Sequence, residues 1–337
     1  MLENNPLCVS SVAEFIEAIQ TTTNTNIPSL LRRDEIMKKH LSDLDYHAIE
    51  RGKAYVEAVI SDQKSNQMSK IPQKKRWFYR GHYSSEYELI PSVFRSGNWE
   101  KEDFFYHEMA VRSPEHFQGK SHLDKLVTMQ HYDCPTRLLD ITSNPLVALF
   151  FACMNYGCST CNKAREGSVF AFSPVSKDVV YSDSDRALMI SCLSRFSKED
   201  KEELYRVACE RLHEDSFKQV KGGSRYDDGS VEKLYHEITR ENPAFKREMR
   251  PLDLLQPLFI QPNKTNMRIT KQDGAFILCG LSENANEAKG KIEMTVSKEI
   301  RVREQEKILE ELDSLGINEA SLFPELDKVA HYLKTRG

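Results

Sequence analysis

The stretch MQHYDCPTRLLDITSNPLVALFFA, residues Met129 to Ala152, decides how the middle of this chain folds. Its first half gathers polar side chains that can donate or accept hydrogen bonds, and its second half is apolar. Ser143 or Asn144 can cap a helix here, and Pro145 follows at a position where a first-turn proline is tolerated. We therefore expect a buried helix after Pro145 that is entered through a polar cluster.

Elements of both types flank this stretch. Aromatic and β-branched residues favour strands in WFYRG (77–81) and SVFAFSP (168–174), the first running into a turn at its glycine. The spacing of apolar residues or a charged composition predicts helices in further segments. They include residues 9–19, 104–117, 122–132, about 185–213 and, as an exposed helix rich in salt bridges, 297–315. Residues 257–280 contain two short strands around a turn.

These elements predict a single α+β domain, with a small, mostly antiparallel sheet surrounded by many helices. Residues 1–70 form an N-terminal helical part that carries a charged insertion. Residues 71–337 form the core, and we expect one compact unit with the N-terminal helices.

Composition narrows the classes of function. The 337 residues carry a net charge of −4, so no global basic field attracts nucleic acid. The longest apolar run, PLVALFFACM, is shorter than the ~20 residues of a membrane-spanning helix. The first residues lack the basic start and apolar core of a secretory signal, and the eight cysteines are scattered, so we expect a cytoplasmic protein with reduced thiols.

Several blocks together resemble the FRG domain family, which is named for a Phe/Tyr-Arg-Gly tripeptide. In WFYRGHYSSEYELIPSVFR (77–95) the tripeptide is Tyr79, Arg80 and Gly81. The resemblance continues through four later segments and covers nearly the whole chain. They are Gln130–His131, PTRLLD (135–140) with residues 144–152, RITKQDGAF (268–276) and GINEASLFPELD (316–327). Family members often carry a glycine between the Gln-His pair and PTRLLD, where this chain has Asp133 and Cys134, so we expect a stiffer loop.

Two arginines of these blocks are candidate ligand contacts. Arg80 closes an apolar strand, and a buried guanidinium needs an anion, which its planar fork binds through paired hydrogen bonds. The alternative is an internal acid such as Asp140 or Glu108. Arg137 lies between a proline turn and two leucines, so its head group faces a cavity or a partner. Together the two arginines could clamp a pyrophosphate.

The strand that ends in Arg-Gly is also similar to the start of the NAD site in some ADP-ribosyltransferases. That resemblance implies NAD as a cofactor or substrate, held by Tyr79, Arg80 and Gly81. The residues expected to line the nicotinamide or ribose are Gln130, His131, Thr136 and Asn144, and Arg268 is a further candidate contact. Those enzymes usually carry a Glu-x-Glu or Gln-x-Glu motif near a later strand. This chain has Gln272 and Asp273 instead, and Asp273 could stabilise an oxocarbenium ion or simply form a turn.

Two other side chains leave alternatives open. His131 could act as a general base, because imidazole titrates near neutrality, or it could hydrogen-bond a loop carbonyl. Asp140 could orient Arg137 or His131, although a role as the cap of the next helix is favoured.

The cysteines Cys153, Cys158 and Cys161 have a C-x4-C-x2-C spacing that resembles part of a zinc site. A closed site needs four ligands, and only Cys134 could complete this one. We expect free thiols here rather than a metal.

Three functions remain open at this point. The first is an NAD-handling enzyme of ADP-ribosyltransferase type, as in bacterial toxins or antiphage effectors. The second is a module that binds a nucleotide or another small anion without chemistry. The third is a protein-interaction domain with structural arginines, and it predicts that Arg80 and Arg137 are both buried against acids.

Overall fold

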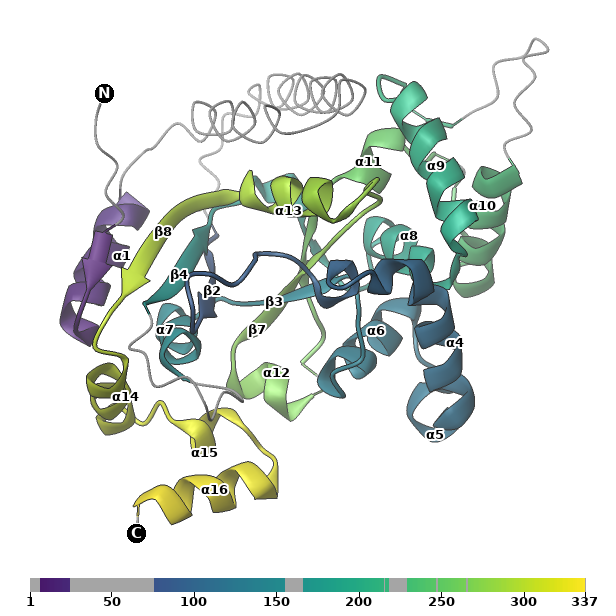
Figure 1. Ribbon diagram of the computed structural model, residues 1–337. Helices are drawn as coiled ribbons and strands as arrows, with labels where there is room; N and C mark the ends of the chain where they lie inside the picture. The colour runs from purple at the N-terminus through teal and green to yellow at the C-terminus, as the bar shows by residue number, and fades with distance from the viewer. Residues whose placement is uncertain are drawn as a thin grey trace, which may run out of the picture.

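The computed structural model describes residues 7–24, 76–154, 166–214, 216–217, 229–246, 248–264 and 266–336 (Figure 1). In these ranges the strands form one mixed sheet in the order β1-β8-β4-β2-β3-β7-β6-β5. The strands are β1 Leu7–Val9, β2 Phe78–His82, β3 Leu138–Thr142, β4 Gly167–Phe172, β5 Val179–Tyr181, β6 Leu258–Gln261, β7 Gly274–Leu278 and β8 Val296–Val302. Only β1–β8 and β5–β6 pair in parallel within this part of the chain, so the predicted α+β class with a mostly antiparallel sheet is confirmed.

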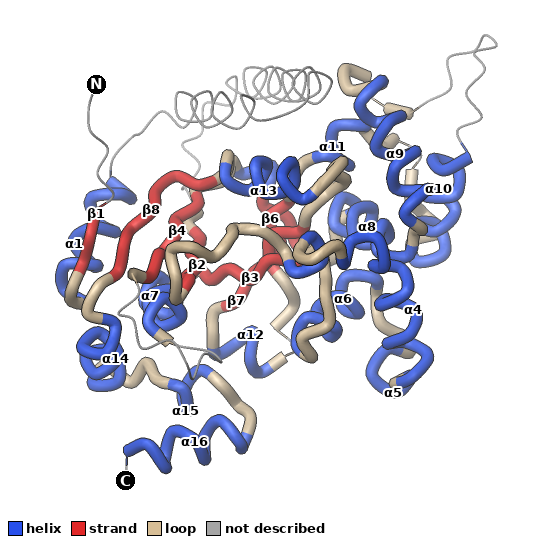
Figure 2. Tube along the Cα trace, in the orientation of Figure 1, coloured by secondary structure: helices blue, strands red, loops and turns tan. Residues whose placement is uncertain are grey.

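Helices surround this sheet (Figure 2). In the first half they are α1 Val12–Asn24, the 3₁₀ turns η2 Ser92–Phe94 and η3 Asn98–Lys101, α4 Glu102–Arg112, α5 Pro114–Phe117, α6 His122–His131 and α7 Pro145–Cys153. The second half contributes η4 Ser176–Asp178, α8 Asp185–Cys192, η5 Leu193–Arg195, α9 Lys198–Glu210, α10 Gly229–Glu241 and α11 Pro251–Leu255. The last are α12 Met267–Lys271, α13 Ala285–Glu293, α14 Gln305–Ser314, α15 Glu319–Leu322 and α16 Leu326–Arg336.

The apolar core lies in three parts around the sheet. One face of the sheet packs side chains such as Phe78, Ile141 and Ile277 against η2 and α13. On the opposite face, α1, α7 and α14 cover the half formed by β2, β4 and β8. Helices α6, α8, α9 and α10 cover the other half, formed by β3, β7 and β6. Helices α6 and α7 therefore pack on different halves of the sheet, as Figure 1 shows.

The two halves of the sheet meet at a weak seam between β2 and β3. Tyr79 and Thr142 are the one pair of residues in register across this seam, whereas β2 pairs with β4 and β3 pairs with β7 through five residue pairs each. Because adjacent strands normally share a continuous ladder, the single pair means that β2 and β3 diverge beyond it.

Helix α7 begins as its sequence predicts. The Asn144 side chain accepts a hydrogen bond from the Leu146 amide, and Pro145 occupies the first turn. The helix lies directly against β2 at Gly81, where an added Cβ atom would stand 1.9 Å from the Ala148 carbonyl oxygen. The predicted turn at this glycine is wrong, because Gly81 lies inside the strand and its missing side chain makes room for the helix.

Residues 297–302 are also a strand rather than the first part of a predicted exposed helix. Ile300 and Val302 are buried at a spacing of two, which is the period of a strand, and they pair with β4. The helix α14 begins only at Gln305. Strands β1, β3 and β5 were not predicted either, and the helix expected over about 185–213 is divided into α8 and α9 by η5.

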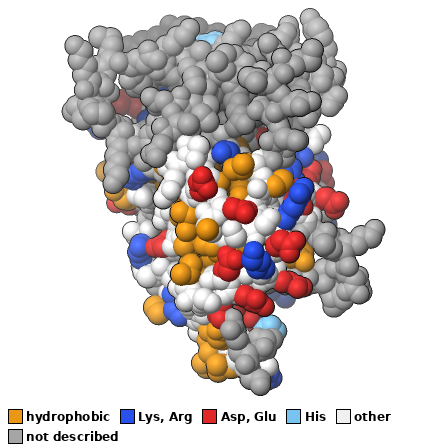
Figure 3. Space-filling view, turned by 90° about the vertical axis from the view of Figure 1, so that its left-hand side faces the viewer, with side chains coloured by type: hydrophobic (Ala, Val, Ile, Leu, Met, Phe, Trp, Pro, Cys, Tyr) orange, Lys and Arg blue, Asp and Glu red, His pale blue; other side chains and the backbone are white. Residues whose placement is uncertain are grey.

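The predicted division at residue 70 cannot be placed, because residues 25–75 lie outside the described ranges. Over the described residues, no helix has both the length and the apolar character needed to cross a membrane. On the face that carries α1 and α14, acidic and basic side chains are interspersed with hydrophobic ones (Figure 3).

Candidate functional site

The side chain of Arg80 bridges the seam between β2 and β3. Its Nε atom donates to Nε2 of His82 over 2.8 Å, and its Nη1 atom donates to the carbonyl oxygen of Asp140 over 2.5 Å. Both acceptors are uncharged. In the described part of the chain, Nη2 of Arg80 has no hydrogen-bond acceptor, and the side chain is only half-buried. One face of this guanidinium fork is therefore left for a further anionic partner.

Arg80 and His82 are buried without a directly bonded acid, and this shifts the pKa of both side chains. Burial lowers the pKa of Arg80 to about 10, with the Asp140 carboxylate acting in the opposite direction and Arg95 adding to the decrease. Burial, followed by the charges of Arg80 and Arg95, lowers the pKa of His82 to about 2. His82 is thus neutral, and its Nε2 lone pair is free to accept from Arg80.

Its other ring nitrogen, Nδ1, must then carry the proton. This atom is buried, and no acceptor among the described residues meets the geometry of a hydrogen bond with it. The backbone of Tyr87 raises the pKa of His82 as the weakest of the causes.

The Asp140 carboxylate belongs to a short chain of hydrogen bonds from the Gln-His and PTRLLD blocks. Gln130 donates from Nε2 to Oδ2 of Asp140 over 2.8 Å, and Thr136 donates from Oγ1 to Oε1 of Gln130 over 2.5 Å. Asp140 lies in the middle of β3 with its side chain exposed. The favoured prediction that it caps the next helix is wrong, because Asn144 performs that role.

The loop between these two blocks contains a residue with a positive φ. Asp133 adopts a φ of 56°, in the left-handed region that favours glycine. The chain keeps the backbone conformation with an aspartate, a residue that tolerates it better than most.

His131 lies within reach of the charges of both Asp140 and Arg268. Burial lowers the pKa of His131, Arg268 lowers it further, and Asp140 raises it. Its Nε2 atom is buried and has no hydrogen-bond partner among the described residues. The Arg268 guanidinium stacks over the ring of Phe323, with 4.9 Å between its Cζ atom and the ring centroid. His131 at the end of α6 is thus influenced by an acid from β3 and by a cation from α12.

Gln272, Asp273 and Asn144 form a different contact set at the far end of β3. Gln272 donates from Nε2 to the Leu322 carbonyl oxygen over 3.2 Å, and Asn144 donates from Nδ2 to Oδ2 of Asp273 over 3.3 Å. The Asp273 backbone has a φ of 47°, and its carbonyl oxygen accepts from the Ser143 amide. These contacts join the starts of α7 and β7. They match the expectation that Asp273 forms a turn.

Arg137 is sealed in the interior, where 2% of it is exposed. Its Nε and Nη2 atoms donate to the two carboxylate oxygens of Glu102 over 2.7 and 2.5 Å. Its Nη1 atom donates to the Cys279 carbonyl oxygen, and Ser194 and Lys201 complete the contacts of Glu102. Burial by itself would raise the pKa of Glu102, but Arg137 and Lys201 outweigh it and hold the pKa at about 2.

The predicted clamp of Arg80 and Arg137 does not form, because the two guanidinium groups have entirely different partners. Arg137 matches its alternative, a structural arginine paired with an acid. Arg80 does not, because it bonds the backbone of Asp140 rather than a carboxylate, and Glu108 pairs with Arg112 instead.

Arg95 is a further cation near Arg80, and the sequence did not single it out as a ligand contact. Its side chain is exposed, and its Nη2 atom donates to the Ile90 carbonyl oxygen over 2.8 Å. It lies close enough to Arg80 and His82 to lower the pKa of both. The available signal was its position at the end of the same sequence block as Arg80.

Tyr79 and Gly81, the neighbours of Arg80, lie on the opposite face of the sheet from it, because strand side chains alternate. Both pack beneath α7, and burial raises the pKa of Tyr79 to about 12. They position the strand rather than line the face that carries the Arg80 side chain.

The cysteine cluster can be described only in part. Cys153 is a buried free thiol in α7, and burial raises its pKa. Burial also raises the pKa of the half-buried thiol of Cys134. Cys158 and Cys161 lie outside the described residues. Within the described ranges, no three His, Cys, Asp or Glu side chains come together in a way that could hold a metal ion.

Comparison with known proteins agrees with the family blocks between residues 77 and 152, whereas the blocks at 268–276 and 316–327 lie outside the matched range. Residues 75–159 match the family model of the FRG domain, and this range contains β2, α6, β3 and α7. No curated protein and no solved structure matches the chain. The chain therefore carries an FRG domain, whose Arg-Gly pair joins the two halves of the sheet through Arg80 and seats α7 through Gly81.

Proposed function

We propose that the FRG domain binds a small anionic ligand of nucleotide or NAD type at Arg80. The observation that carries this proposal is the state of the Arg80 guanidinium: it is held by two neutral acceptors and keeps Nη2 without an acceptor in the described part of the chain. A phosphate placed there would supply the bonded negative charge that this partly buried cation lacks.

The surrounding charges favour the same type of ligand. Arg95 adds a second guanidinium next to Arg80, while Asp140 is the acid whose charge acts on both arginines. Glu88 also acts on Arg95 and is paired with Lys289, so these five side chains, three cations and two acids, sum to a net charge of +1. His131, on which both Asp140 and Arg268 act, would offer further contacts together with Arg268 for a ligand that extends past Asp140.

An ADP-ribosyltransferase-like activity, as in toxin or antiphage effectors, is the second candidate. It needs an acid near the ribose carbon that reacts. Asp140 is favoured for this role over Asp273, because its carboxylate is exposed and its charge acts on Arg80. Gln130, hydrogen-bonded to Asp140, would contact the ribose, and His131 would serve as the proton acceptor.

Calorimetric titration with NAD, ADP-ribose and ATP tests the binding proposal on the full chain. We expect Arg95→Ala to weaken binding about tenfold, since an exposed arginine can be removed without disturbing the core. Arg80→Lys keeps the charge but loses the planar fork, so we expect a loss of at least tenfold.

Arg112→Ala is the matched control, because Arg112 is an exposed arginine of α4 that is bonded only to Glu108 in the described chain. It should bind as the unmodified chain does. The proposal is rejected if none of the three ligands binds, or if the two site variants bind as tightly as this control.

A further inference from the structure

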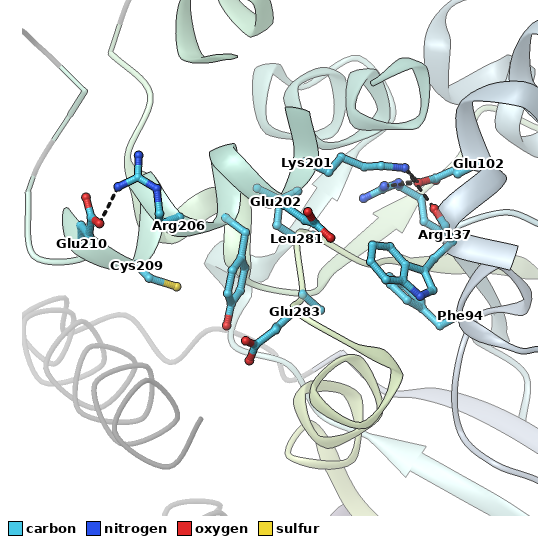
Figure 4. A pocket seen from close by; sticks show the side chains of 14 residues that line it. Phe94, Glu102, Arg137, Lys201, Glu202, Arg206, Cys209, Glu210, Leu281 and Glu283 are labelled. Carbon is cyan, nitrogen blue, oxygen red and sulfur yellow. Dashed lines mark hydrogen bonds and ion pairs between the residues drawn. The ribbon is translucent and has the colours of Figure 1, made fainter. Parts of the chain in front are cut away.

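A cavity of about 520 Å³ lies away from the Arg80 contacts, between α9, the segment after β7 and the Phe94–Glu102 region (Figure 4). This volume lies within the range of small-molecule sites, roughly 300–1,000 Å³. Apolar and aromatic side chains form much of its wall, among them Phe94, Trp99, Tyr205 and Leu281.

The inner end of the cavity carries an excess positive charge. Glu102, Arg137 and Lys201 line it, and each is at least nine-tenths buried. One carboxylate and two cations sum to +1. Figure 4 shows the three side chains gathered together at one end of the pocket, joined by the ion pairs Arg137–Glu102 and Lys201–Glu102. A buried excess charge is costly unless a counter-ion accompanies it.

These cations also keep unused hydrogen-bond donors. Lys201 donates to Glu102 over 3.0 Å and to the Trp99 carbonyl oxygen over 3.3 Å, which uses two of its three N–H bonds. Nη1 and Nη2 of Arg137 each make one hydrogen bond within the described chain and have a second N–H bond to offer. The Glu102 carboxylate, in contrast, already accepts four hydrogen bonds.

The rest of the cavity has the opposite character. The exposed acids Glu202, Glu283 and Glu210 line it together with the cation Arg206, which is paired with Glu210. In Figure 4 this pair lies at the end of the pocket away from Lys201. An acidic rim disfavours a ligand that carries several negative charges, because like charges repel.

We propose that this cavity binds a small amphipathic monocarboxylate. Its carboxylate meets Lys201 and Arg137, whose excess charge of +1 it neutralises, and its apolar body packs against the aromatic wall. The site is separate from the Arg80 contacts and does not depend on the proposed nucleotide binding.

The test uses three related probes: 3-phenylpropionate, its uncharged amide and the dianion phenylsuccinate. Trp77 and Trp99 are the two tryptophans, so Trp77→Phe leaves Trp99, on the cavity wall, as the fluorescent reporter. We expect saturable quenching by 3-phenylpropionate, with affinity at least tenfold higher than for the amide or the dianion. Glu202→Gln removes one acid of the rim, so the affinity for phenylsuccinate should rise toward the affinity for 3-phenylpropionate.

Lys201→Met removes the excess charge and keeps the Arg137–Glu102 pair, so the fold survives while 3-phenylpropionate affinity falls at least tenfold. Lys307→Met, on the exposed face of α14, is the control and should leave the affinity unchanged. The proposal is overturned by equal affinity for acid and amide, by the absence of saturable binding, or by unchanged affinity in Lys201→Met. Arg95→Ala should not alter this binding, so the failure of either proposed site can be told from the failure of the other.

Discussion

The carbonyl oxygen of Ala148 lies 1.9 Å from the point where a Cβ atom on Gly81 would stand. The glycine of the Arg-Gly pair and the helix that follows PTRLLD are therefore one packing unit, although 67 residues separate positions 81 and 148 in the chain. Because α7 lies so close to β2, Arg80 is held at the seam of the sheet with its side chain on the other face.

Gly81→Ala should destabilise the chain strongly. The new methyl group meets helix backbone, which cannot move without shifting α7, so we expect a loss of about 3 kcal/mol or more in the free energy of unfolding. Gly290→Ala in α13 is the matched control, because its Cβ meets no atom within 4 Å, and it should be neutral or stabilise by about 0.5–1 kcal/mol. Urea denaturation of both variants measures the difference, and equal stabilities would contradict the packing argument.

His82 should make stability depend on pH. Its pKa is about 2 in the folded chain and ordinarily 6.5, so the unfolded chain binds the extra proton between these values. Stability from this group is therefore present above pH 6.5 and lost as the pH falls, by about 2 kcal/mol between pH 7.5 and 5.

The variant His82→Gln tests this dependence, because glutamine can still accept from Arg80 but does not titrate. Its unfolding free energy should decrease about 2 kcal/mol less than that of the unmodified chain over the same pH range. His236→Gln, at an exposed position of α10, should keep the original pH slope. An unchanged slope in His82→Gln would disprove the assignment.

Glu102→Gln should unfold the core around Arg137. The change leaves two buried cations without their acid, and the loss of one partner from a buried pair costs about 3–5 kcal/mol. Glu108→Gln removes an exposed pair with Arg112 and should cost less than about 1 kcal/mol. Thermal unfolding of both variants compares them, and similar midpoints would mean that Arg137 is not held by Glu102.

Asp140→Asn separates binding from catalysis if the chain acts on NAD. Asp140 raises the pKa of Arg80, so its removal leaves more uncompensated positive charge and should tighten the binding of NAD. Release of nicotinamide should fall about 100-fold or more, because the acid that stabilises a developing cation is gone. Asp273→Asn is the control and should release nicotinamide as fast as the unmodified chain. If Asp273→Asn lost this activity and Asp140→Asn kept it, Asp273 would be the acid.

How far the sequence predicts the site depends on the range of each interaction. Asn144 and Pro145 act on their own helix turn, so the start of α7 was predictable. The positive φ of Asp133 is also local, because it depends on the backbone of one residue. The spacing of Ile300 and Val302 was compatible with a short strand, but the charged residues around them favoured a helix until pairing with β4 was known.

The chain by itself determined the FRG blocks, the α+β class and the polar character of the Gln130–Asp140 stretch, because those properties depend on residue type and short spacing. Only the tertiary structure decided which arginine is available. Arg80 and Arg137 both adjoin an apolar stretch of the sequence, but Glu102 reaches Arg137 and no carboxylate bonds Arg80. That difference comes from contacts between distant segments, and the energy of a buried charge depends on its partner rather than on its neighbours in the chain.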